Sequence, residues 1–83
     1  MNVTLKLYAS LSDFLPADAR HNQVQLDLPE GATVGGVIER YRLPPKLTHL
    51  VLVNGAYVAP DARASTALRE GDQLAVWPPI AGG

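Results

Sequence analysis

Three stretches of the chain alternate apolar and polar residues, which is the pattern of a strand with one buried face. Residues 3–8 are apolar at positions 3, 5 and 7, and residues 23–28 are apolar at positions 24, 26 and 28. Near the other end, residues 73–77 bring Leu74 and Val76 to one side. The sequence therefore predicts three strands, each with a core-facing and an outward-facing side.

A fourth strand is predicted over residues 50–53, which are apolar at every position. Such a run is typical of a strand that is covered on both sides or placed at a binding surface, and we expect it to lie centrally in the sheet. The dipeptide Asn54-Gly55 suits a type I′ turn, after which residues 56–58 can return as a short strand. This part of the chain is interpreted as a hairpin.

Residues 33–41 carry the pattern of an amphipathic helix, with apolar positions 34, 37, 38 and 41 on one face. Thr33 can cap its N-terminus, and the prolines at 44–45 end it. Because Gly35 and Gly36 each weaken a helix by up to ~1 kcal/mol relative to alanine, packing against the sheet must hold it.

The remaining segments are short connections. Residues 9–15 have the spacing of a short helical segment that Pro16 ends, and residues 17–22 have the composition of a polar loop. Residues 61–67 are small and polar, and no element is assigned to them. Leu68 is the expected buried anchor after that loop, and residues 70–72 make the turn into the last strand.

The predicted order is strand, strand, helix, strand, short strand, strand, with the helix across one face of a mixed sheet of about five strands. This is the α+β arrangement called the β-grasp, or ubiquitin-like, fold. A chain of 83 residues suits one domain. We expect this domain over residues 1–78 and a flexible tail over residues 79–83.

The composition of the chain reduces the number of possible functions. Seven basic residues stand against eight acidic ones without a run of lysine or arginine, so the chain lacks the footprint of a nucleic-acid binder. It has no cysteine, which excludes a disulfide, a thiolate nucleophile and a cysteine metal site. The start alternates where a secretory signal would be continuously apolar, and no segment approaches a membrane span of ~20 apolar residues. We expect a cytoplasmic protein without a membrane partner.

The end of the chain carries the candidate chemistry. Two prolines without backbone N–H groups should stop strand pairing and send the chain out in an extended direction, and the residues after them lose side-chain bulk step by step. This segment consists of Pro78, Pro79, Ile80, Ala81, Gly82 and Gly83. Ile80 is the candidate anchor for a partner, and a slim end of this kind can thread a narrow tunnel.

The candidate working group is the carboxylate of Gly83. A carboxylate is ionised at neutral pH and is a poor electrophile, so its use as a group carrier requires activation, most simply as an acyl-adenylate made from ATP. The chain has no phosphate-cradling loop, so a partner must supply that step. The alternative is that Gly82-Gly83 is only a frayed terminus. The strand, prolines and apolar residue before it favour the functional interpretation.

The stretch from Leu68 to Gly83, LREGDQLAVWPPIAGG, resembles the end of the MoaD/ThiS family of sulfur carriers, with its glycine-aspartate turn, final strand and double-glycine tail. Val53-Asn54 at the hairpin and residues 8–13 add to a resemblance that covers most of the chain. The two prolines and the helical segment after the first strand are more similar to the molybdopterin synthase small subunit than to the thiazole-pathway carrier. The prolines at 44–45 replace a longer helix there and leave the pathway open.

The resemblance implies that a ubiquitin-activating-type adenylyltransferase uses ATP to adenylate Gly83, with Gly82 beside it. Sulfur from a sulfurtransferase or cysteine desulfurase then displaces AMP and leaves a thiocarboxylate. The molybdopterin synthase large subunit, or alternatively thiazole synthase, would receive this sulfur. Catalytic groups belong to the partners, so the chain is expected to be no enzyme and to bind no cofactor or metal itself.

Two aromatic side chains outside the tail are candidates for partner binding. Trp77 is out of phase with its buried neighbours and shares a face with Tyr8 if the first and last strands are adjacent, which would form an exposed aromatic patch next to the tail. The alternative is that Trp77 is an ordinary core or edge residue, because strand phase can slip by one. His21 and His49 lack metal-ligand spacing or a paired nucleophile.

Charged residues near the last turn, Arg69, Glu70 and Asp72, could face a partner but are better described as solvated turn residues. Two other functions remain open at this stage. One is a protein modifier that joins its terminal glycine to a target lysine. The other is a β-grasp module that binds through strand edges or the Tyr8/Trp77 face without covalent chemistry.

Overall fold

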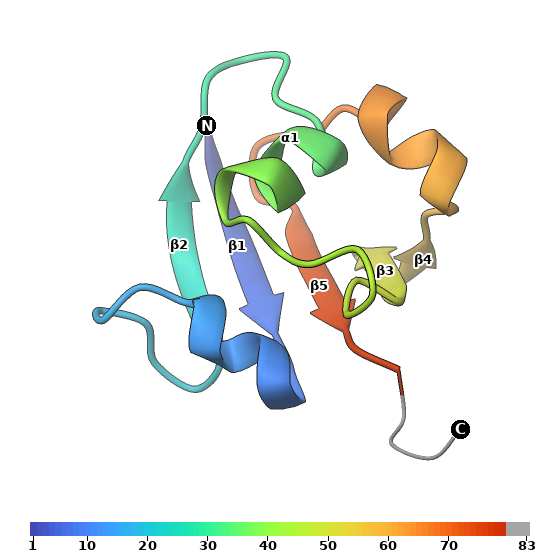
Figure 1. Cartoon of the computed structure of the whole chain (residues 1–83). Helices are drawn as coiled ribbons and strands as arrows, with labels where there is room; N and C mark the ends of the chain where they lie inside the picture. Colours follow the sequence, from blue (N-terminus) through green and yellow to red (C-terminus); the bar gives the residue numbers. More distant parts are fainter. Residues whose placement is uncertain (80–83) are drawn as a thin grey trace.

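The alternating stretches form one mixed sheet in the computed structural model, which describes residues 1–79 (Figure 1). Within these residues the strand order is β2-β1-β5-β3-β4. The strands are β1 (Asn2–Leu7), β2 (Gln23–Asp27), β3 (Leu50–Val53), β4 (Ala56–Tyr57) and β5 (Gln73–Trp77). A single α-helix of the described chain, α1 (Val34–Arg40), packs across one face, as predicted for a β-grasp fold.

The centre of the sheet is β5, which pairs in parallel with β1 and antiparallel with β3. The parallel register sets Leu5 beside Leu74 and Leu7 beside Val76, and all four side chains are fully buried under α1. The expectation that residues 50–53 are central was therefore wrong in part. The strand β3 is interior, but its outer neighbour is the two-residue edge strand β4.

The helix α1 begins as the sequence predicts, because the Gly36 amide donates a 3.1 Å hydrogen bond to Oγ1 of Thr33. Val34 and Val37 are buried, and Ile38 is partly buried against the same core. The helix has only seven residues, so packing on the sheet rather than intrinsic propensity stabilises it.

Two short 3-10 helices flank the sheet. The first, η1 (Ala9–Phe14), follows β1 as expected and buries Leu11. The second, η2 (Pro60–Ser65), was not predicted, since the sequence shows only a small, polar stretch there. Gly35 allows η2 to lie close to α1, because a β-carbon there would lie 3.1–3.2 Å from backbone atoms of Arg63 and Ala64 and would require a small shift. That contact is not visible in local sequence.

The hairpin between β3 and β4 has the predicted turn. Asn54 and Gly55 both have positive φ, at 51° and 84°, as a type I′ turn requires. The anchor Leu68 is buried, and Gly71 in the following turn has a φ of 85°. The connections before and after η2 therefore behave as the sequence indicates.

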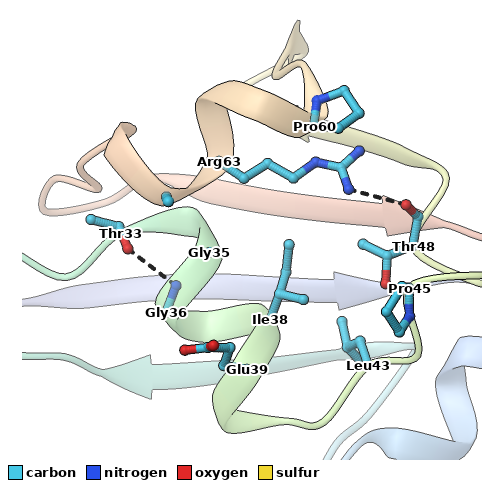
Figure 2. A pocket seen from close by; sticks show the side chains of 11 residues that line it. Thr33, Gly35, Gly36, Ile38, Glu39, Leu43, Pro45, Thr48, Pro60 and Arg63 are labelled. Carbon is cyan, nitrogen blue, oxygen red and sulfur yellow. Dashed lines mark hydrogen bonds between the residues drawn. The ribbon is translucent and has the colours of Figure 1, made fainter.

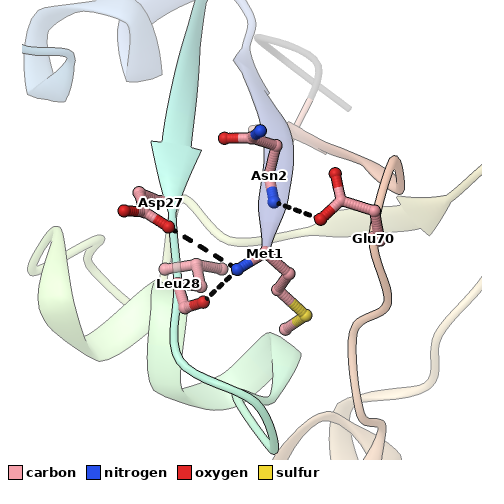
Figure 3. A network of polar contacts seen from close by, with 5 residues as sticks. All are labelled: Met1, Asn2, Asp27, Leu28 and Glu70. Atoms are coloured by element: carbon pink, nitrogen blue, oxygen red, sulfur yellow. Dashed lines mark hydrogen bonds and ion pairs between the residues drawn. The ribbon is translucent and has the colours of Figure 1, made fainter.

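The start of the chain is tied to both neighbours of β1 (Figure 3). The Met1 amine donates to the Leu28 carbonyl at 2.7 Å and lies 3.5 Å from a carboxylate oxygen of Asp27. The Asn2 amide donates to Oε1 of Glu70 at 3.0 Å. Glu70 therefore has a structural contact, and the turn before β5 is held against the first residues of β1.

The end of α1 contains an unusual residue. The Leu43 amide donates to the Ile38 carbonyl at 3.1 Å and the Arg42 amide donates to the Glu39 carbonyl at 3.0 Å, which is the Schellman pattern of helix termination. The position with left-handed backbone is normally glycine, yet here it is Arg42, with a φ of 54°. An arginine at this position costs conformational energy that glycine would not.

Replacing Arg42 by glycine should therefore raise the free energy of unfolding by about 0.5–1 kcal/mol, measured by urea denaturation. The matched control is Arg40→Gly at the last residue of α1, which should lower stability by up to about 1 kcal/mol because glycine is a poor helix former at negative φ. A loss of stability in Arg42→Gly would contradict this account of the helix end.

Candidate functional site

An aromatic pair stands where the two central parallel strands end. Tyr8 directly follows β1 and Trp77 ends β5, and their rings stack with centroids 4.2 Å apart and an interplanar angle of 3°. The Tyr8 amide donates to the Val76 carbonyl at 3.2 Å, which extends the strand pairing up to the rings. The predicted phase of Trp77 and its pairing with Tyr8 are therefore confirmed, and both side chains are partly exposed rather than core.

The apolar surface extends beyond this pair along the sheet. In the register of β3, Leu50 lies opposite Trp77 and Leu52 opposite Ala75, and Leu52 lies opposite Tyr57 of β4. Alternation therefore places these side chains on the face that α1 does not cover. We name this surface the aromatic face and define it by Tyr8, Leu50, Leu52, Tyr57 and Trp77. Tyr57 is the large hydrophobic side chain most exposed on it, at 59%.

Leu50, Leu52 and Tyr57 were not among the predicted site residues, although a binding surface was one of the two predicted settings for residues 50–53. A signal for the two leucines was present, because a run that is apolar at every position presents apolar groups on both faces of a strand. Which of those groups met solvent depended on the helix covering only one face. Tyr57 had no signal, since an isolated tyrosine in a short strand suits either side.

The tail leaves the sheet beside this aromatic face. Because β1 and β5 are parallel, they end at the same end of the sheet, where η1 begins and where Pro78 and Pro79 follow Trp77 (Figure 1). Pro78 is partly buried and Pro79 is exposed. The predicted site residues Ile80, Ala81, Gly82 and Gly83 lie outside the described residues, so their roles remain predictions.

Two motifs of the family resemblance turn out to contact each other. Nδ2 of Asn54 donates to Oδ1 of Asp72 at 2.8 Å, and the Gln73 amide donates to Oδ1 of Asn54 at 2.9 Å. The other carboxylate oxygen of Asp72 accepts the Arg69 amide at 2.8 Å. These bonds attach the β3–β4 hairpin to the start of β5. The pair therefore positions the strand that carries Trp77.

Metal chemistry has no support in the part of the chain that is described. In residues 1–79, no group of three or more histidine, cysteine, aspartate or glutamate side chains is placed to hold a metal ion. His21 lies in a tight turn with a φ of 54°, and His49 is an exposed residue before β3. The same residues contain no helix with the length and apolar character needed to cross a membrane.

The stack offers a direct measurement, because Trp77 is the one tryptophan of the sequence. Replacing Tyr8 by alanine should shift Trp77 fluorescence emission to longer wavelength and lower stability by about 0.5–1.5 kcal/mol, since the ring that covers the indole is lost. Tyr57→Ala on the same face is the control and should leave the emission unchanged. Equal shifts in both variants would contradict the stacked arrangement.

Comparison with known proteins supports one family. The family model described as Mut7-C ubiquitin matches residues 1–81. No curated protein matches the chain in sequence. The structure is similar to SAMP1, small archaeal modifier protein 1, from Haloferax volcanii, with a TM-score of 0.70, 27% identity and complete coverage of both chains.

Two further solved structures are of the same type. A Pyrococcus furiosus protein described provisionally as molybdopterin converting factor, subunit 1, has a TM-score of 0.66 and 26% identity, over 95% of this chain and 98% of its own. ThiS, a thiamine biosynthesis protein from Geobacter metallireducens, has a TM-score of 0.66 over the whole of both chains, but at 18% identity it supports the fold alone. The chain therefore belongs to the Mut7-C ubiquitin family and has the β-grasp fold of the MoaD/ThiS type of ubiquitin-like proteins.

Proposed function

We propose that this protein is a sulfur carrier that delivers sulfur from a thiocarboxylate on Gly83 during molybdenum cofactor biosynthesis. The observation that carries the proposal is the placement of the aromatic face. The stacked rings of Tyr8 and Trp77 stand directly before Pro78 and Pro79, from which the glycine tail continues. A partner that binds the aromatic face would therefore hold a part of the chain that is close in sequence to the proposed reactive residue, Gly83.

The chemistry follows from the groups that the chain has and lacks. The Gly83 carboxylate attacks the α-phosphorus of ATP on the activating enzyme, and pyrophosphate leaves. A persulfide sulfur of a donor enzyme then attacks the acyl carbon, and AMP leaves. A second thiol cleaves the sulfur–sulfur bond and forms a disulfide with the donor cysteine, which frees the thiocarboxylate. The sulfur must come from a partner because the chain has no cysteine.

The proposed partners are a ubiquitin-activating-type adenylyltransferase, a sulfurtransferase or cysteine desulfurase, and the molybdopterin synthase large subunit. The Pyrococcus furiosus protein supports the last of these, because its description concerns molybdopterin and its likeness covers nearly all of both chains. Thiazole synthase is the alternative acceptor. Because activation consumes ATP, we place the reaction in the cytoplasm.

The aromatic face is the proposed docking surface for these partners. Tyrosine, tryptophan and leucine side chains that are partly exposed on one face form the kind of apolar centre that binds proteins. Aromatic residues at such centres carry much of the binding free energy. The chain would therefore act as a co-substrate, with the catalytic side chains on the enzymes that bind it.

A second candidate function is protein modification. The observation that favours it is the likeness to SAMP1, which is named as a modifier protein and matches over the complete length of both chains. In this case a target lysine would attack the same activated acyl carbon, and an isopeptide bond would form as AMP leaves. Isolation of lysine-linked conjugates would favour this function over sulfur transfer.

The intact mass of the chain tests the proposal. After incubation with ATP, an activating enzyme and a sulfur donor, the mass should show one terminal oxygen replaced by sulfur, whereas a variant lacking Gly83 should keep its mass and its fold. Unchanged sulfur transfer by the shortened variant would remove the proposed site. Retained partner function without the tail would instead support a module that only binds.

The aromatic face has its own test. Trp77→Ala should raise the KM of the activating enzyme for the chain by roughly 10- to 100-fold, because removal of a central aromatic contact costs about 2 kcal/mol or more of binding. Val24→Ala, a partly buried site on the other face, is the control and should leave KM near its original value. An unchanged KM in Trp77→Ala would show that activation does not use this face.

A further inference from the structure

A groove lies on the opposite side of the molecule from the aromatic face. It has a volume of about 630 Å³ and runs between α1, η2 and residues 43–48 (Figure 2). Its walls are mainly apolar and include Ile38, Leu43, Pro45 and Pro60. Helix α1 covers one face of the sheet, and Tyr8 and Trp77 lie on the other face. A ligand in this groove and a partner on the aromatic face would therefore not compete for the same surface.

Arg63 brings a positive charge into this groove. Its guanidinium nitrogens donate to the Thr48 carbonyl at 3.1 Å and the His49 carbonyl at 3.3 Å, so the side chain bridges η2 and the segment before β3. Figure 2 shows the side chain crossing from η2 to Thr48. Glu39 also lines the groove, but among residues 1–79 the ion pair within bonding distance is that of Met1 with Asp27, so Arg63 is not paired with a carboxylate of this part.

The charges of the chain are divided between the groove and the rest. The two segments that line the groove, residues 33–48 and 60–64, hold four basic and two acidic residues. The remaining residues hold three basic and six acidic residues, although the whole chain has a net charge of only -1. Three of these basic residues, Arg40, Arg42 and Lys46, are exposed, and each is next in sequence to a residue that lines the groove. The segments that line the groove therefore carry an excess of positive charge, which favours an anionic partner.

One of these basic residues, Arg42, has a strained backbone. The residue occupies a left-handed position that favours glycine, and its neighbour Leu43 lines the groove. A charged side chain is kept there at a conformational cost. Non-glycine residues with strained backbone are concentrated at binding and active sites, so the strain favours a binding role for Arg42.

We propose that this groove binds a short acidic segment of a partner protein, with one apolar side chain of the segment seated between α1 and η2. Apolar walls with a cationic surround fit a peptide that carries both features. A nucleic acid fits less well, because a phosphate backbone is held by many cations and offers no apolar side chain for the walls. The site is independent of the tail and does not rest on the proposed sulfur chemistry.

The test uses synthetic hexapeptides and the amide NMR spectrum of the ¹⁵N-labelled full chain. The probe is acetyl-Asp-Glu-Leu-Phe-Asp-Glu-amide. The controls replace its acidic residues with lysine or its Leu-Phe centre with Gly-Gly. The acidic probe should produce saturable shifts at the amides of Gly35, Ile38, Thr48 and Ala64, and not at Tyr8 or Trp77. Both control peptides should bind at least about fivefold more weakly.

Variants of the chain separate charge from fold. Lys46→Glu and Arg42→Gly should each weaken binding of the acidic probe by about three- to tenfold, and Arg42→Gly does so in a chain expected to be more stable. Arg20→Glu, an exposed charge change outside the groove, should alter binding less than about twofold. Folded spectra of all three variants keep the comparison valid.

Several results would overturn the proposal. One is the absence of saturable shifts at the groove amides, and another is equal binding of the Gly-Gly peptide, which would mean that no apolar anchor is used. A third is tighter binding of a single-stranded oligonucleotide at the same amides, which would assign the surface to nucleic acid. Equal weakening by Arg20→Glu would reduce the effect to net charge and would also reject the site.

Discussion

The parallel pairing of β1 with β5 is the interaction on which the rest of the structure depends. It joins the first and last strands of the described chain and sets four fully buried side chains, Leu5, Leu7, Leu74 and Val76, in one layer. The same pairing makes both strands end together, and this brings Tyr8 onto Trp77. A small domain has little surplus of buried area, so its core and its candidate site are built from the same two strands.

The polar contacts around β1 and β5 mainly fix the positions of the segments next to these two strands. Asn54 and Asp72 attach the hairpin to the start of β5, and Glu70 attaches the preceding turn to β1. Asn54 and Glu70 are exposed and Asp72 is partly exposed, and the individual contributions of these groups to stability are modest. These contacts fix the place where β5 begins. They therefore also fix the place where Trp77 and the two prolines after it leave the sheet. The residues that resemble the family pattern thus include several that hold the site in place rather than react.

The two faces of the sheet have different chemical character. The side under α1 is the hydrophobic core, and at its margin lies a mainly apolar groove with an excess of basic residues in the segments that line it. The other side carries the aromatic face. The proposed carrier function requires that more than one enzyme binds the chain and releases it. Two separate surfaces on opposite sides would let one contact be made before another is broken, and this is the functional meaning that we attach to the arrangement.

The sequence by itself determined the faces of the strands, the cap at Thr33, the type I′ turn at Asn54-Gly55 and the buried anchor Leu68, because each depends on local periodicity or backbone angles. It also identified the Tyr8 and Trp77 pair on the condition that their strands are neighbours. The tertiary structure alone decided that condition, the central place of β5, the exposed part of β3 and the 3-10 helix η2. These features depend on contacts between residues far apart in the chain, such as Gly35 with Ala64, and an alternating pattern records which face a residue takes but not which strand lies beside it.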